Sequence, residues 1–88
     1  MDFRWNEWNE EHLAQHGVEP EAAEQVVRAA GRLYPRRIGE DKWLVWGQGP
    51  AGELLQVIFV LDDEGSIFVL HARPLTAGEK RRHRRQRR

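Results

Sequence analysis

Residues 54–73 read LLQVIFVLDDEGSIFVLHAR, and this stretch decides the fold. Two runs rich in β-branched and aromatic residues, at 54–61 and 66–73, flank the acidic turn DDEG at 62–65. Such runs around a short polar turn are typical of two antiparallel strands joined as a hairpin. The first run is apolar at every position except Gln56, which predicts a central strand that is covered on both faces.

Weaker strand signals lie on the N-terminal side of this hairpin. Trp43–Gly47 is a short aromatic and β-branched run, and residues 33–38 form a less apolar one. The connection 48–52 is short enough for a second hairpin. We therefore expect an antiparallel meander, with Phe3–Trp5 as a further short edge strand.

The first helix is expected close to the N-terminus. Asn6 is a favourable N-cap, because its side chain accepts a hydrogen bond from an unpaired amide of the first turn. The helix is expected to end at His16, with Gly17 directly after its end. Trp8 and Leu13 are the residues that we expect to face inward.

Two further helices are predicted by their end signals. Pro20 at a first helical position and Gly31 beyond the end bracket the second helix. Its apolar residues recur at helical spacing: Ala22, Ala23, Val26, Val27 and Ala30. Thr76 and Glu79 fit the capping box that begins many helices, so a short basic helix or tail is expected over about 76–88.

Length and composition restrict the class of protein. The chain has 88 residues, which favours one small domain over residues 1–88. We expect an α+β fold in which two N-terminal helices pack on a three- to four-stranded antiparallel sheet, followed by the basic helix. The absence of cysteine excludes disulfides, thiol nucleophiles and cysteine-ligated metals. Apolar runs far shorter than the roughly 20 residues of a membrane span, and an acidic start, predict a soluble cytoplasmic protein without membrane association.

The net charge of zero conceals a strongly polar distribution along the chain. Residues 1–30 carry 7 acidic and 2 basic side chains, a net −5. Residues 31–72 carry 6 and 4, a net −2, whereas residues 73–88 carry 1 and 8, a net +7. A terminal block of positive charge typically contacts nucleic acid or an acidic partner, and a solvated tail is the simpler alternative.

The last predicted strand carries two residues suited to phosphate chemistry. Strand alternation separates Phe68 from His71 and Arg73, so the latter two lie on the open face if the helices cover the Phe68 face. Arginine binds a phosphate through its fork of donors, and histidine transfers protons. Gln56 shares this face in one of the two registers. The simpler interpretation is that His71 and Arg73 are ordinary solvent-facing residues, because such pairs are common at this spacing.

The terminal helix offers a second acid or base. His83 follows Glu79 by four residues and therefore lies on the same helical face. A surface histidine and a capping glutamate explain these two residues equally well. His12 and His16 are also four residues apart, but no third ligand stands at a recognisable spacing, so no metal is expected.

Two segments of the sequence carry a family resemblance. The first is FRWN at 3–6 followed by LAQHGV at 13–18, and the second is VLHAR at 69–73 followed by TAGEKRR at 76–82. In order and spacing they resemble the BrnT family, toxins of type II toxin–antitoxin systems that are small ribonucleases with a RelE-like fold. The resemblance covers nearly the whole chain.

The resemblance implies a bacterial endoribonuclease toxin that needs neither metal nor cofactor and that arrests translation by cleaving RNA. It also implies a BrnA-like antitoxin as partner, whose ribbon-helix-helix part binds operator DNA. In such ribonucleases the 2′-hydroxyl attacks the adjacent phosphate, a base takes its proton, and an acid protonates the leaving 5′-oxygen.

Carried over by position, Arg73 stabilises the phosphate in the transition state. His83 stands where the family often has tyrosine, and with His71 and Glu79 it is a candidate for proton transfer. The sequence departs from the family at Asn9 and Gln15, where lysine is expected, and at Ala77-Gly78, which replace a commonly basic pair. It also departs at His71, which replaces a small residue and could supply a group for proton transfer. The candidates for substrate binding are Lys80, Arg81, Arg82 and Gln56.

Two alternatives remain open from the sequence. One is a noncatalytic module that binds nucleic acid or an acidic protein through its basic helix. The other is a homodimer in which residues 73–88 of one copy contact the acidic first helices of a second copy.

Overall fold

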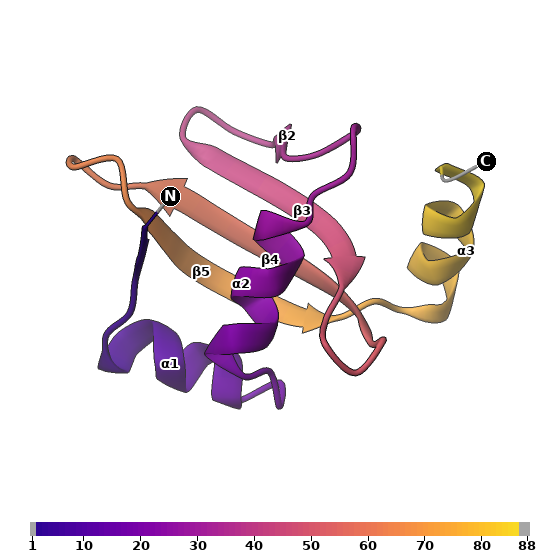
Figure 1. Ribbon diagram of the computed structural model, residues 1–88, viewed down its shortest axis with the longest axis horizontal. Coiled ribbons are helices and arrows are strands. Elements are labelled where there is room, and N and C mark those ends of the chain that lie inside the picture. Colours follow the sequence, from indigo (N-terminus) through magenta and orange to yellow (C-terminus); the bar gives the residue numbers. More distant parts are fainter. Residues whose placement is uncertain (1, 87–88) are drawn as a thin grey trace.

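The computed structural model describes residues 2–86 (Figure 1). The last two residues of the predicted helix over 76–88 lie outside this range. In chain order the elements are β1 (Phe3–Arg4), α1 (Glu7–Ala14), α2 (Pro20–Arg28), β2 (Arg36–Arg37), β3 (Lys42–Gln48), β4 (Leu54–Leu61), β5 (Ile67–Pro74) and α3 (Ala77–Gln86).

The sheet has five strands in the order β1-β5-β4-β3-β2. The antiparallel meander of β3, β4 and β5 is as expected, and the bounds of β4 match the prediction. The expectation of three to four antiparallel strands is wrong in the number of strands and at the β1 edge, whereas β2 pairs antiparallel to β3 as expected. β1 pairs parallel to β5, with Phe3 opposite Ile67, so the sheet is mixed. The strand expected over 33–38 shortens to Arg36–Arg37.

The pairing of β4 with β5 is interrupted by a β-bulge. Ile58 lies opposite His71, but the next β4 residue, Phe59, lies opposite Val69. Leu70 is therefore an extra residue in β5. A bulge of this kind reverses the alternation of faces along the strand that contains it.

The bulge decides which side chains of β5 enter the core. Three of its residues are fully buried there: Ile67, Val69 and Ala72. His71 and Arg73 consequently lie on the opposite face, as expected, but Phe68 lies there too. The predicted separation of Phe68 from His71 and Arg73 is wrong, because simple alternation takes no account of the extra residue.

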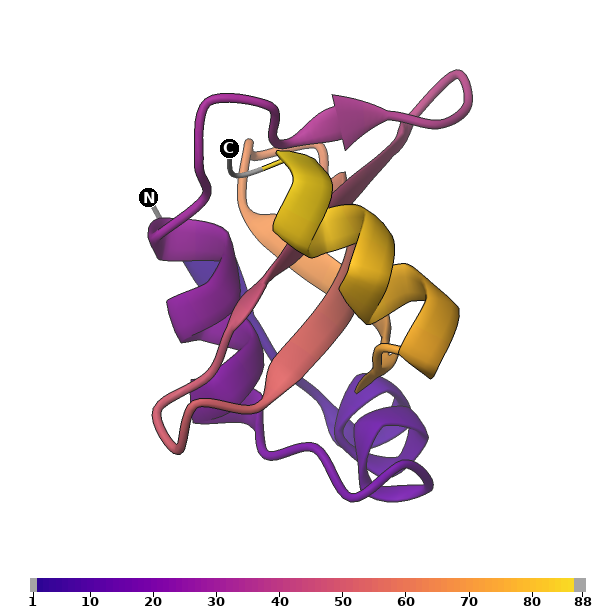
Figure 2. The same cartoon turned by 90° about the vertical axis from the view of Figure 1, so that its right-hand side faces the viewer.

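The two faces of the sheet are covered differently. α1 and α2 bury their apolar residues against one face, where Leu13, Ala23 and Val26 meet the central strands. Neighbouring residues of β3 show the two sides: Val45 is in this core, whereas Trp46 packs against α3. Figure 2 shows α2 and α3 on opposite sides of the strands. Among residues 2–86 no helix has the length and apolar character needed to cross a bilayer.

The start of α1 differs from the expected packing. Asn9 is the buried residue of this turn, and Trp8 remains 48% exposed and stacks on Phe68. The side chains of Asn6 and Asn9 each accept a hydrogen bond from the other's backbone amide, at 3.2 and 2.8 Å. The Nδ2 of Asn9 also donates to the carbonyl oxygen of Arg4 at 3.1 Å. The helix ends at Ala14, before the expected His16.

Replacing Asn9 tests this capping arrangement. Asn9→Ala removes the buried amide that pairs with the part-buried Asn6 amide and Arg4 carbonyl, so we expect the free energy of unfolding to fall by about 1–2 kcal/mol. Urea denaturation followed by circular dichroism measures this change. The exposed neighbour Glu10 is the control, and Glu10→Ala should change stability by less than about 0.5 kcal/mol. Equal losses in the two variants would contradict the capping role.

Candidate functional site on the open face of the sheet

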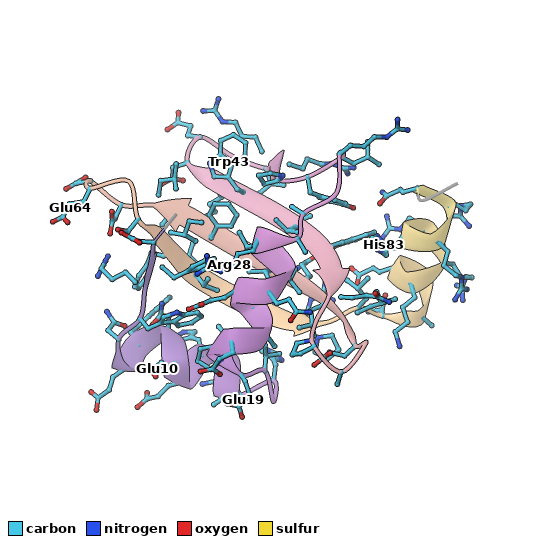
Figure 3. All side chains as sticks on the ribbon, viewed as in Figure 1. Glu10, Glu19, Arg28, Trp43, Glu64 and His83 are labelled. Atoms are coloured by element: carbon cyan, nitrogen blue, oxygen red, sulfur yellow. The ribbon has the colours of Figure 1, made fainter. Side chains whose placement is uncertain are left out.

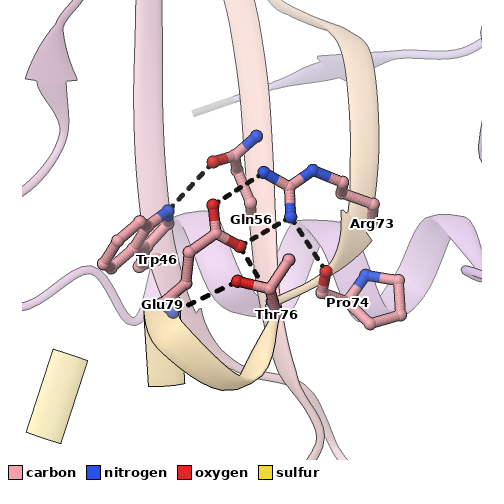
Figure 4. A network of polar contacts seen from close by, with 6 residues as sticks. All are labelled: Trp46, Gln56, Arg73, Pro74, Thr76 and Glu79. Carbon is pink, nitrogen blue, oxygen red and sulfur yellow. Dashed lines mark hydrogen bonds and ion pairs between the residues drawn. The ribbon is translucent and has the colours of Figure 1, made fainter. Parts of the chain in front are cut away.

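Arg73 and Glu79 form a bidentate ion pair that joins β5 to α3. Arg73 donates from Nη1 to Oε1 at 2.7 Å and from Nη2 to Oε2 at 2.8 Å (Figure 4). Glu79 Oε1 also accepts from the Thr76 amide at 2.8 Å, and Thr76 Oγ1 accepts from the Glu79 amide at 3.2 Å. The predicted capping box is therefore present, and the same carboxylate that caps α3 also holds Arg73.

The pair determines what Glu79 can do chemically. Hydrogen bonds from Arg73 and from the Thr76 amide lower the pKa of Glu79 to about 2. The carboxylate is thus ionised at neutral pH, and it has no proton to donate. The same contact raises the pKa of Arg73 above its ordinary value. This geometry favours Glu79 as a positioning residue for Arg73 over a direct part in proton transfer.

Gln56 continues the polar row across the sheet. It lies opposite Arg73 on β5 and opposite Trp46 on β3, so the three side chains share one face. The indole Nε1 of Trp46 donates to Gln56 Oε1 at 3.0 Å (Figure 4). Gln56 is 8% exposed. The register that brings Gln56 next to Arg73, which the sequence left open, is the one that occurs.

His71 lies two residues from Arg73 on the same face. Its ring is 5.4 Å from that of His16, which follows α1. Burial lowers the pKa of His71 below its ordinary value, and the neighbouring charges of His16 and Arg73 act in the same direction. A neutral imidazole at physiological pH is the form that a general base requires.

His83 lies apart from His71, at the β3 side of the row. It is 8% exposed and packs against Tyr34 and Trp46, with ring centroids 6.5 and 6.2 Å away (Figure 3). The strands of Trp46 and Arg73 are separated by β4, which places them about 10 Å apart. The structure thus places His83 beside Trp46 of β3 and His71 on β5, with β4 between these two strands.

The outer surface of α3 is cationic. Five of its side chains are positively charged and exposed: Lys80, Arg81, Arg82, Arg84 and Arg85. Within residues 2–86 the ion pairs join Arg4 to Asp62, Arg28 to Glu24 and Arg73 to Glu79, so these five have no acidic partner there. Glu10 and Glu19 lie far from α3, on the side of the acidic helices (Figure 3).

Tyr34 is a residue of this region that was not identified from the sequence. Tyr34 comes from an irregular segment, and its hydroxyl donates to Gln86 Oε1 at 2.7 Å. Arg82 lies over the Trp46 ring, 5.3 Å from its centroid. No local pattern links Tyr34 to residues so much later in the chain. In the described part of the chain, no group of three or more His, Cys, Asp or Glu could hold a metal ion.

Comparison with solved structures identifies the class of fold as that of a small ribonuclease toxin. The chain is similar to the crystal structure of the Brucella abortus ribonuclease toxin BrnT, with a TM-score of 0.69 and 18% sequence identity. The match covers 86% of this chain and 97% of that one. The expected BrnT-like fold is thereby confirmed. No protein-family model matches the sequence, and no curated protein matches it either.

The Arg73–Glu79 pair makes stability dependent on pH. Because the pKa of Glu79 is lower in the folded state, its contribution is complete above the ordinary carboxyl range near 4.5 and is lost as pH falls towards about 2. Glu79→Gln should therefore reduce the free energy of unfolding by about 1–2 kcal/mol at pH 7. It should also reduce the loss of stability that wild type shows as pH falls from about 4.5 to about 2. Urea denaturation between pH 2 and 7 measures both effects, with the exposed Glu64→Gln as control. If Glu79→Gln lost as much stability at low pH as wild type does, the Arg73–Glu79 pair would not be the cause of the pH dependence.

Proposed function

We propose that this protein is the toxin of a type II toxin–antitoxin system and that it is a metal-independent endoribonuclease. The observation that carries the proposal is the presence of His71 and Arg73 side by side on the open face, next to the basic α3. The likeness of the fold to a ribonuclease toxin supports it. A BrnA-like antitoxin, with a ribbon-helix-helix part for operator DNA, is the proposed protein partner.

Arg73 has donors left for a phosphate although it is paired with Glu79. A guanidinium carries five N–H groups in a fixed plane. Nη1 donates one N–H to the Pro74 carbonyl and the other to Glu79, and Nη2 donates one N–H to Glu79. Three of the five N–H groups are therefore used. The Nε–H and the second N–H of Nη2 point from the other edge of the plane. This edge forms a second fork that fits two oxygens of a phosphodiester, while Glu79 holds the plane in position.

In the proposed reaction His71 is the general base. Its neutral imidazole takes the proton of the 2′-hydroxyl, and the resulting oxygen attacks the adjacent phosphorus. Arg73 stabilises the charge that develops on the pentacoordinate phosphorus, and the 5′-oxygen leaves with a proton from an acid. His16 supplies a second imidazole next to His71, so we propose it as that acid. The products are a 2′,3′-cyclic phosphate and a 5′-hydroxyl.

The decisive test is expression in a bacterial host under tight induction, with growth followed and RNA 5′ ends mapped. Wild type should arrest growth and produce new 5′-hydroxyl ends, and Arg73→Ala should abolish both, because charge stabilisation by one such group contributes about 10²–10³ in rate. Arg28→Ala, which removes a partly exposed arginine of α2, should behave like wild type. Normal growth and unchanged RNA with a folded, well-expressed wild type would refute the ribonuclease and favour the noncatalytic binding module.

Salt dependence tests whether α3 binds the substrate backbone. With a single-stranded oligodeoxynucleotide, which lacks the attacking 2′-hydroxyl, the logarithm of the binding constant should fall linearly with that of the salt concentration. Arg81→Ala should reduce the magnitude of this slope by about 0.7, the value for one phosphate contact with a single strand. Fluorescence anisotropy measures the slope. If Arg81→Ala and Arg28→Ala gave the same slope as wild type, Arg81 would not contact phosphate.

A further inference from the structure

A cavity of about 520 Å³ lies between the end of α2, the segment that follows it, and α3. Its volume is within the range of pockets that hold small ligands. Three rings line it, those of Tyr34, Trp46 and His83. They come from the segment after α2, from β3 and from α3, and their centroids are 6.2 to 6.5 Å apart in each pair, so the rings pack together as one aromatic wall of the cavity.

Arginines border these rings. The guanidinium of Arg36 lies over the Tyr34 ring, 5.4 Å from its centroid, and that of Arg82 lies over Trp46. Arg32 lines the cavity itself. Within residues 2–86 none of the three is in an ion pair. Aromatic faces with adjoining arginines are the combination by which proteins bind single-stranded nucleic acid, since the rings stack on bases and the cations meet phosphates.

The polar lining suits the edge of a base. Side-chain amides of Gln25, Gln48 and Gln86 reach the cavity from three different elements. Each amide offers both a donor and an acceptor, as does the edge of every nucleobase. Burial raises the pKa of Tyr34, so its phenol stays protonated at neutral pH and keeps its bond to Gln86.

We propose that this cavity binds one unstacked nucleobase of single-stranded RNA, and that it selects the nucleotide beside the cleaved phosphate. The hydrogen bond from Trp46 to Gln56 connects the wall of the cavity to the row that ends at Arg73. In this proposal the base lies in the cavity and the adjacent phosphate lies at Arg73, about 10 Å from Trp46 across β4. The selective role rests on the proposed ribonuclease function, but binding of the base does not.

The first experiment titrates the purified protein with each of the four ribonucleoside 5′-monophosphates. Nuclear magnetic resonance follows the indole N–H signals of the tryptophans. The signal of Trp46 should shift with at least one nucleotide, and that of Trp8, which lies outside the cavity, should not. Ribose 5-phosphate is the matched probe without a base. If it shifts Trp46 as much as the nucleotides do, or if no nucleotide shifts Trp46, the proposal is overturned.

Substitution of Tyr34 tests the stacking. Tyr34→Ala should weaken nucleotide binding about five- to 150-fold, the range measured for the loss of one base–aromatic stack. Tyr34→Phe keeps the ring and loses only the bond to Gln86, so it should bind within about threefold of wild type. Should Tyr34→Ala fail to fold, Arg32→Ala and the titration of wild type still decide the matter. Equal affinity of Tyr34→Ala and wild type would overturn the proposal.

The two proposals fail in distinguishable ways. If wild type cleaves RNA and the bases at its cut sites are the same in Tyr34→Ala, the ribonuclease stands and the selective cavity is overturned. If nucleotides shift Trp46 while wild type leaves cellular RNA intact, the base-binding cavity stands and the ribonuclease is refuted. A changed base preference at the cut sites of Tyr34→Ala would support both.

Discussion

One extra residue in β5, Leu70, is the constraint on which the core and the candidate site both depend. Without it, regular alternation would place His71 and Arg73 on the same face as Ile67 and Val69, beneath the N-terminal helices. An arginine there would lose its hydration, which is costly for an unpaired charge. The bulge leaves the apolar residues in the core and turns the imidazole and the guanidinium to the opposite face.

The Arg73–Glu79 pair holds the basic helix α3 against β5, next to the candidate site. This pair and the capping box hold the N-terminal end of α3. The hydrogen bond from Tyr34 to Gln86 and the packing of His83 hold its C-terminal half. A helix without an apolar stripe would otherwise gain little from packing. Because Glu79 binds one edge of the guanidinium through two hydrogen bonds, the orientation of Arg73 relative to α3 is fixed.

Charge is distributed asymmetrically over the molecule. Acidic side chains gather on α1 and α2, and five exposed cations gather on α3, which lies across the sheet from α2 (Figure 2). A polyanion is drawn to the face that carries Arg73 and is repelled from the helix-covered face. A single chain of net charge zero can therefore still carry the cationic surface that the proposed function requires. The same asymmetry is the basis for the homodimer expected as an alternative, which stays a prediction.

The sequence by itself determined the helices through Asn6 and Pro20, the meander through β4 and its neighbours, and the capping box at Thr76, because each depends on residues close together in the chain. Tertiary structure alone decided the parallel pairing of β1 with β5, the bulge at Leu70, and the cavity at Tyr34. These depend on contacts between distant segments and on one inserted residue, which periodicity does not register. Arg73 was predictable as a cation on the open face, whereas its capture by Glu79 required the packing of α3 on the sheet.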